Sequence, residues 1–274
     1  MYATRARNMR DAFASAPRAV TLDASLVTSV DIAFVLLTCF GCFAIQALSQ
    51  RAFARRGPNW FTALSADARA DIGIRCASAV WGTIAASATI PVIVPLIMRG
   101  TTVMERVYAV TPRARALCCA ACGYFVWDVC VSLRYYDKQY ITHAIASVIT
   151  FGMPQFMPNG FLHYYGLVFI LWECSLPFLT ARTILIKSGR GSTLAFYVAQ
   201  TLGFGIFIAL RFFMGIPVMY TYVTDAYAMY SRGLATPKPV YAFYVVGGLM
   251  FQTFNCIWVF GMAKTVLRGK RKRV

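Results

Sequence analysis

The sequence is short of charged residues, and this shortage excludes an ordinary soluble fold. Only 14% of its 274 residues are charged, against about 25% in typical soluble domains. No polar stretch is long enough to form a soluble domain, while 59% of the residues are hydrophobic and the mean hydropathy is +0.59. One globular core cannot hide that much apolar surface, so part of it must face lipid. We therefore expect an all-α, polytopic transmembrane helical protein.

Acidic residues and histidines are scarce as well. Ten Asp and Glu stand against 27 Lys and Arg, which gives a net charge of +17. The basic residues lie in short clusters between apolar runs, as expected beside anionic lipid headgroups, so we predict membrane lipids as partners and no nucleic acid. Only two histidines are present, which excludes a multi-histidine metal centre. Because Gly-rich phosphate loops, G-x-S-x-G and H-E-x-x-H are absent too, we expect no metal and no cofactor.

The nine cysteines lie in or at the edges of apolar runs, which argues against a disulfide framework. Cys39 and Cys42, like Cys119 and Cys122, have the spacing of a CxxC motif. A redox or zinc motif would need a polar loop or a βαβ context, and neither is present. We interpret these cysteines as small apolar packing residues.

Seven segments approach the ~20 apolar residues that a membrane-spanning helix needs. They are residues 26–48, 76–98, 116–136, 140–157, 161–186, 194–222 and 240–266. The fourth is the weakest, because it is short and contains Gly152 and Pro154. The expected organisation is a basic N-terminal segment, a first helix with a basic loop, the main transmembrane domain and a basic tail, over residues 1–25, 26–71, 72–266 and 267–274.

The distribution of Lys and Arg predicts the orientation. With seven spans, sixteen basic residues share a side with the C-terminus and ten lie on the other side, so we expect a cytosolic C-terminus. The last five residues, from Lys270 to Val274, fit the KxKxx form of the dibasic signal that retrieves proteins to the endoplasmic reticulum, with Lys270 and Lys272 as its lysines. An ordinary stop-transfer cluster is the alternative. The favoured localisation is a multi-pass protein of the endoplasmic reticulum membrane.

Charged side chains within the expected spans require a structural or functional explanation. Each raises the free energy of membrane insertion by about 2.5–3.5 kcal/mol at the centre of a helix. Acids and potential cations occur in four separate spans: Asp128, His143, Glu173 and Arg211. They can neutralise one another only by converging on one interior cavity, which we predict. Bonding between neighbouring helices is the alternative for each, and it is the favoured interpretation for Gln200, Gln252 and Asn255.

Five sequence pieces occur in a fixed order over residues 72–266. They are Gly123-Tyr124-Phe125-Val126-Trp127-Asp128, then His143, then Trp172-Glu173-Cys174-Ser175-Leu176-Pro177-Phe178-Leu179 with Arg182, then Arg211 before Gly215 and Pro217, and last Asn255-Cys256-Ile257-Trp258. This order resembles the TLC domain, the membrane domain shared by translocating-chain-associated proteins, ceramide synthases and the neuronal ceroid lipofuscinosis protein of the endoplasmic reticulum. The nearest likeness is to small TLC-domain-containing proteins with an E-x-S-x-P-F sequence.

The resemblance implies about seven spans, six of them in a ring around a central cavity. The implied cavity residues are Tyr124, Asp128, Glu173, Arg211 and Asn255. Ceramide synthases, however, carry a His-His pair in the fourth span and an acidic motif that begins His-Asp. Here a single histidine, His143, stands between Thr142 and Ala144, and Trp172-Glu173 occupies the His-Asp position. Half of that catalytic apparatus is therefore missing.

Three functions remain open on these grounds. The leading hypothesis is a non-catalytic or weakly catalytic protein of the endoplasmic reticulum that binds an acyl chain or a sphingoid base in its ring and acts in sphingolipid and ceramide homeostasis. The enzymatic alternative is an acyl-CoA-dependent N-acyltransferase that makes ceramide, with His143 as its base. A third hypothesis is a cargo receptor for export from the endoplasmic reticulum, motivated by the retrieval tail.

Overall fold

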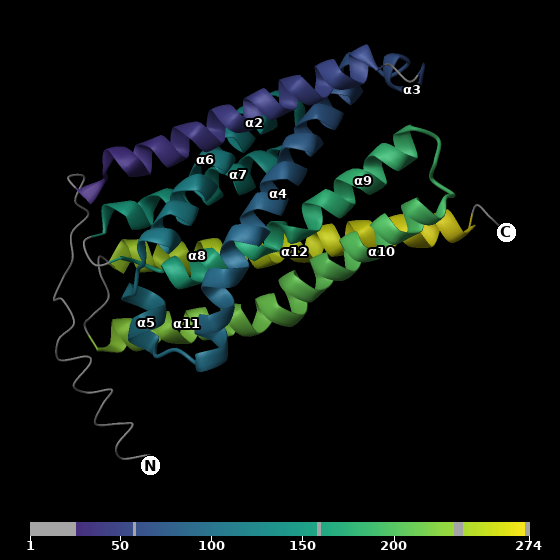
Figure 1. Cartoon of the computed structure of the whole chain (residues 1–274). Coiled ribbons are helices and arrows are strands. Elements are labelled where there is room, and N and C mark those ends of the chain that lie inside the picture. Colours follow the sequence, from purple (N-terminus) through teal and green to yellow (C-terminus); the bar gives the residue numbers. More distant parts are fainter. Residues whose placement is uncertain (1–25, 57–58, 158–159, 233–237, 272–274) are drawn as a thin grey trace.

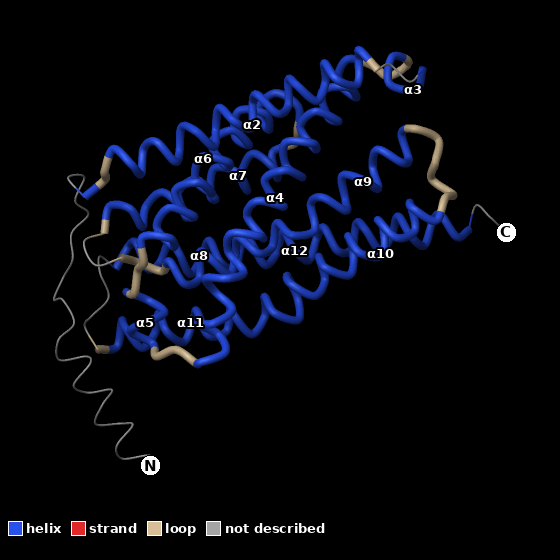
Figure 2. Tube along the Cα trace, viewed as in Figure 1, coloured by secondary structure: helices blue, strands red, loops and turns tan. Residues whose placement is uncertain are grey.

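The computed structural model describes residues 26–56, 59–157, 160–232 and 238–271, and side chains as far as residue 264. Its regular structure in these ranges is entirely helical, with no strand (Figure 2). The predicted all-α, polytopic membrane fold is confirmed. Both lysines of the expected retrieval signal lie outside the description, Lys272 altogether and Lys270 in its side chain.

The helices follow one another with short connections. In chain order they are α2 (Ser29–Arg55), α3 (Asn59–Thr62), α4 (Ala66–Arg99), α5 (Val103–Tyr108), α6 (Pro112–Tyr135), α7 (Lys138–Gly152), η2 (Met153–Phe156), α8 (His163–Ile170), η3 (Leu171–Ser175), α9 (Leu176–Lys187), α10 (Leu194–Ile208), η4 (Ala209–Met214), α11 (Gly215–Ser231) and α12 (Lys238–Arg271). η2 and η3 are 3₁₀ turns, and η4 is a π-helical segment. Several of these elements continue directly into the next, so they form fewer and longer rods.

Six of these rods within the described residues are long and apolar enough to cross a membrane, judged by length and composition. They are Ser29–Arg55, Ala66–Arg99, Pro112–Tyr135, His163–Lys187, Leu194–Ser231 and Lys238–Lys264. The fourth expected span corresponds to α7, which has only 15 residues. Together with η2 it extends about 30 Å, close to the thickness of the hydrocarbon core. A pass by α7 and η2 stays a prediction, because the six long rods do not include it.

The rods lie side by side, and their ends gather at two poles (Figure 1). We call the pole with α5 and the starts of α2, α6 and α12 the α5 end. The opposite pole, with α3, the α9–α10 connection and the end of α12, is the α3 end. Capping boxes begin two helices at the α5 end, Thr28 with Asp31 for α2 and Thr102 with Glu105 for α5. These side chains satisfy the backbone N–H groups that a helix start leaves unpaired.

Asp31 also anchors α2 to the rest of the bundle. Its carboxylate accepts two hydrogen bonds from the guanidinium of Arg115 on α6, at 2.8 and 2.7 Å. Arg115 in addition donates to the carbonyl oxygens of Leu26 and Gln155. Asp31, the acid at the start of the first expected span, thus forms a partly buried ion pair with a neighbouring helix.

Several helices extend beyond the expected spans, and α4 and α11 do so most. α4 begins at Ala66, ahead of the expected 76–98 span, and α11 ends at Ser231, beyond the expected limit of residue 222. Ser65 caps α4, and Asp71 and Arg75 pair along its first turns at 3.0 Å. Hydropathy alone truncates such helices, because it scores charges that are neutralised by partners as though they were free.

Gly123 allows α2 and α6 to pack closely, because an added Cβ would overlap the backbone carbonyl oxygen of Val35. We expect Gly123→Ala to lower the free energy of unfolding by about 1–3 kcal/mol, since one helix must shift to make room. Thermal unfolding in detergent would measure it. Gly41→Ala on α2 is the matched control, because its Cβ would meet no atom within 4 Å. Equal melting temperatures for the two variants would contradict the prediction.

Candidate functional site

A cavity of about 560 Å³, the central cavity, lies inside the bundle. Its wall comes from α4, α6, α7, η3 with α9, α10 with η4, and α12, and α2 contributes none of it. Six helical segments therefore surround the cavity and α2 stays outside its lining, which agrees with the ring that the sequence resemblance implies. The volume lies within the range of about 300–1,000 Å³ typical of small-molecule sites.

The deep end of the central cavity holds a buried arginine. Arg211, only 4% exposed, donates hydrogen bonds to Glu173 Oε1 at 3.1 Å, Asn255 Oδ1 at 2.7 Å and the Trp172 carbonyl oxygen at 3.3 Å. Its guanidinium also lies 4.5 Å from the ring centroid of Phe207. The π-helical segment η4 carries this arginine, and such segments often occur at functional sites. Arg211 thus ties η3, η4 and α12 together, through its ion pair with Glu173 and its hydrogen bond to Asn255.

Asp128 lies in the wall of the same cavity and is placed differently. It has no ion-pair partner among the residues the structure describes. One turn earlier on α6, the buried Tyr124 donates its hydroxyl to Ser78 Oγ at 3.3 Å and stacks on Trp81. Asp128 is therefore a carboxylate that faces the cavity without a cation, while Glu173 already has one.

His143 also lines the central cavity, in aromatic surroundings. The rings of Phe125, Phe251, Phe254 and Trp258 surround its imidazole, at centroid distances of 5.1 to 6.3 Å. Its Nδ1 is buried and has no hydrogen-bond partner within the described part of the chain. A general base of the usual kind is oriented by a neighbouring carboxylate. The described contacts of His143 are aromatic instead.

The mouth of the central cavity, at the α3 end, is basic. Arg75 and Arg182 line it together with Tyr136. Asp71 pairs with Arg75 and with Lys187, both at 3.0 Å, and accepts a hydrogen bond from the Tyr136 hydroxyl at 2.9 Å. Two cations, Arg75 and Lys187, thus share one carboxylate, while Arg182 donates to Gln200 Oε1 at 3.2 Å. The opening therefore carries more positive than negative charge.

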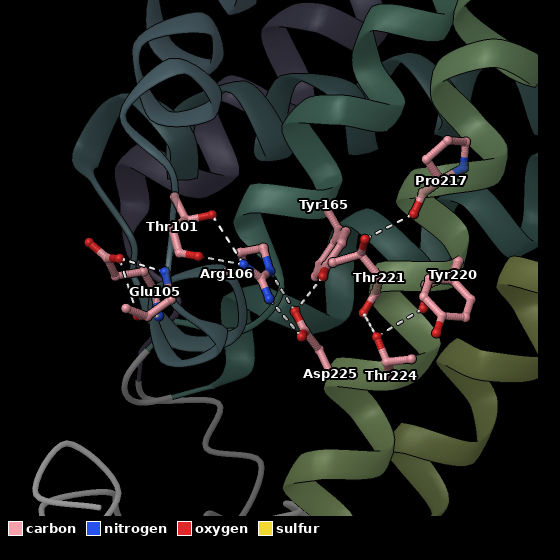
Figure 3. Close-up of polar contacts among 10 residues, drawn as sticks. Thr101, Glu105, Arg106, Tyr165, Pro217, Tyr220, Thr221, Thr224 and Asp225 are labelled. Carbon is pink, nitrogen blue, oxygen red and sulfur yellow. Dashed lines mark hydrogen bonds and ion pairs between the residues drawn. The ribbon is translucent and has the colours of Figure 1, made fainter. Parts of the chain in front are cut away.

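The α5 end is closed by a polar cluster, drawn in Figure 3. Arg106 on α5 donates two hydrogen bonds to Asp225 on α11, at 2.6 and 2.8 Å, and Tyr165 on α8 donates to the same carboxylate. Asp225 raises the pKa of Arg106 above its ordinary range, through these hydrogen bonds first. Behind the cluster, the space lined by Tyr165, Tyr222 and Tyr244 measures only about 10 Å³. The central cavity is therefore accessible from the α3 end.

Five predicted site residues from four elements line the central cavity: Tyr124, Asp128, His143, Glu173 and Arg211. Asn255 reaches it indirectly, through its bond to Arg211. The roles given to them in lipid binding or catalysis stay predictions. Within the described ranges, no group of three His, Cys, Asp or Glu side chains is placed to hold a metal ion.

Sequence reasoning missed the basic mouth and the cluster at the α5 end. Arg75 and Asp225 were assigned to loops, because both expected spans were drawn too short. The available signal for Asp225 was the run of apolar and aromatic residues that continues on both sides of it as far as Tyr230. A helix that continues through such a run forces the acid to find a cation.

Comparison with known proteins agrees with this architecture. A profile of the TLC domain matches residues 71–264. An uncharacterized TLC domain-containing protein of Schizosaccharomyces pombe is 28% identical over 158 residues, which cover 55% of this chain and 52% of that protein. An uncharacterized TLC domain-containing protein of Saccharomyces cerevisiae is 32% identical over 83 residues, which cover 30% of this chain and 25% of that protein. The matches thus span about half or less of these curated relatives.

Proposed function

This chain belongs to the TLC domain family, and from that premise we propose that it binds a membrane lipid in its central cavity and acts in lipid homeostasis of the endoplasmic reticulum. The observation that carries the proposal is Asp128, a carboxylate without an ion-pair partner among the described residues, in a cavity of about 560 Å³. The assignment to the endoplasmic reticulum, with a cytosolic C-terminus, depends on the basic tail.

The charges of the central cavity select the class of lipid. An unpaired carboxylate within a membrane protein is costly, and a bound cation relieves that cost. A long-chain amine such as a sphingoid base supplies an ammonium group for Asp128, and its hydroxyl groups find hydrogen-bond partners near Tyr124 and the unpaired Nδ1 of His143. The cations at the mouth, Arg75 and Arg182, suit the anionic headgroups of the surrounding membrane and not the amine itself.

Binding accounts for this geometry better than acyl transfer does. The acyltransferase alternative requires a carboxylate that orients His143 as a base. Glu173 instead pairs with Arg211, and the described neighbours of the imidazole are aromatic rings. The observed contacts therefore support a cavity that holds a lipid in place.

We expect Asp128→Asn to lower the retention of a long-chain amine by at least about tenfold, because it removes a charge-assisted hydrogen bond. The measurement is mass spectrometry of lipid bound to purified protein that has been delipidated and reloaded with sphingosine. Asp137→Asn is the matched control, since Asp137 is exposed at the start of α7 and makes no capping hydrogen bond. Retention at background level by the unaltered chain, or equal retention by both variants, would contradict the proposal.

A parallel assay separates binding from catalysis. Expressed in cells that lack ceramide synthase, the unaltered chain is expected to restore no ceramide. Ceramide formation that disappears with His143→Ala would overturn the non-catalytic proposal in favour of the acyltransferase. Changes in total membrane lipids without ceramide synthesis would support lipid homeostasis.

A further inference from the structure

A second hollow, the outer groove, lies on the outside of the bundle between α2, α4 and α6. It has a volume of about 670 Å³, and its lining is apolar except for Thr38 and Arg113. No residue of the outer groove also lines the central cavity. Large apolar side chains at its rim, such as Leu37 and Ile84, are 72% and 57% exposed. In a membrane this surface faces lipid.

The shape of the outer groove follows from the helix paths. α2 and α4 meet at the α3 end and diverge toward the α5 end (Figure 1). The opening between them remains unfilled because small residues form much of its lining: Gly41, Ala88, Ala116 and Ala120. On α4 the lining runs from Val80 to Val92, which is about 18 Å of helix. That is close to half of the ~30 Å hydrocarbon core, so the groove has about the depth of one leaflet.

Arg113 at the α5 end of the outer groove differs from the arginines around it. Three neighbours in sequence each pair with a carboxylate: Arg99 with Glu105, Arg106 with Asp225, and Arg115 with Asp31. Arg113 is exposed, lines the groove and has no ion-pair partner among the described residues. Arg113 therefore places a positive charge at the end of the outer groove, at the level of the lipid headgroups.

We infer that the outer groove binds one acyl chain of an anionic glycerophospholipid from the leaflet at the α5 end, with the lipid phosphate paired to Arg113. Burial of the chain supplies apolar contact along α2, α4 and α6. The guanidinium supplies a two-pronged donor that matches a phosphate. This lipid site is independent of the central cavity and of the function proposed for it.

Headgroup competition tests the role of Arg113. Full-length protein is incorporated into nanodiscs with equal amounts of phosphatidylglycerol and phosphatidylcholine of identical acyl chains, and retained lipid is read by native mass spectrometry. We expect the unaltered chain to retain the anionic lipid about fivefold over the zwitterionic one, the preference that one basic residue near a surface provides. Arg113→Gln should reduce this ratio to near unity. Arg134→Gln, an exposed arginine at the other end of α6, should leave it unchanged.

Filling the outer groove tests the role of its apolar wall. Gly41→Phe projects a ring into open space, because a Cβ there would meet no atom within 4 Å. We expect it to displace the groove-bound lipid whatever the headgroup, while Gly205→Phe, equally open on α10 and outside both hollows, leaves it bound. Melting temperatures close to that of the unaltered chain show that the variants fold. Equal losses with both phenylalanines, or with both glutamines, would identify ordinary annular lipid and overturn the inference.

Neither result depends on Asp128. If retention of sphingosine fails while the phosphatidylglycerol preference persists, the function proposed for the central cavity is wrong and the outer groove stands. If sphingosine is retained but the phosphatidylglycerol preference is absent, the function proposed for the central cavity stands and the lipid site in the outer groove is wrong.

Discussion

Arg211→Ala is expected to lower the free energy of unfolding by about 3–5 kcal/mol, because it leaves a buried carboxylate without its cation. Arg211 and Glu173 have side-chain exposures of 5% and 10% and lie 3.1 Å apart. Asn255 and the Trp172 carbonyl oxygen would each lose a donor as well. The shift in melting temperature of purified protein in detergent, together with the yield of monodisperse protein, measures the effect.

Two companion variants separate charge from packing. Glu173→Gln keeps an acceptor for Arg211, so its loss should be smaller and its expression nearly intact. Joint replacement of Glu173 and Arg211 by methionine should recover much of the stability, because no unpaired charge remains. Arg182→Ala, at the half-exposed mouth, provides the matched arginine control. If it destabilises the protein as much as Arg211→Ala does, burial of the pair is not what makes Arg211 important.

Asp225→Ala is the second large effect, again about 3–5 kcal/mol. It removes both acceptor oxygens of Arg106 and the acceptor of the Tyr165 hydroxyl (Figure 3). The carboxylate is 4% exposed and the Arg106 side chain 16%, so water replaces few of the lost contacts. Thermal unfolding and the rate of proteolytic cleavage near α5 measure the loss, because α5 should detach first.

The contributions within this cluster can be told apart. Tyr165→Phe removes one hydrogen bond to a charged acceptor and should cost about 1.5–3 kcal/mol, less than the loss of the carboxylate itself. Asp137→Ala, at an exposed position, should leave stability within about 0.5 kcal/mol of the unaltered chain. Equal melting temperatures for Asp225→Ala and Asp137→Ala would show that the ion pair does not hold α5 against α11.

The candidate site was predicted where polar residues stand inside long apolar runs. Asp128, Glu173 and Arg211 are each unfavourable in the hydrocarbon core of a membrane. A shared interior cavity reduces that free-energy cost, because it removes all three side chains from contact with lipid. The pairing was not predictable in the same way. Glu173 pairs with Arg211 and Asp128 does not, and this choice depends on how η3, η4 and α6 are rotated about their axes. Hydropathy contains no information on that rotation.

Arg75 and Asp225 show a second limit of sequence reasoning. Both lie on helices that continue past the expected span ends, because their charges are neutralised by partners on the same or other helices. A hydropathy average over a window around Asp225 cannot include its partner Arg106, which lies 119 positions earlier in the sequence. The predicted spans therefore ended at charges that the folded protein tolerates.

The scarcity of charged residues, which excluded a soluble fold, is enough by itself to predict that this protein lies in a membrane. Transfer free energies add along the chain, so 59% hydrophobic residues fix a lipid environment and helices that satisfy their own backbone. The tertiary structure alone decided which of the few charges face each other, which one faces the central cavity unpaired, and where an outer groove opens. These outcomes depend on contacts between residues far apart in sequence, such as the helix crossing at Gly123 and Val35. Their energies exist only once the helices have packed.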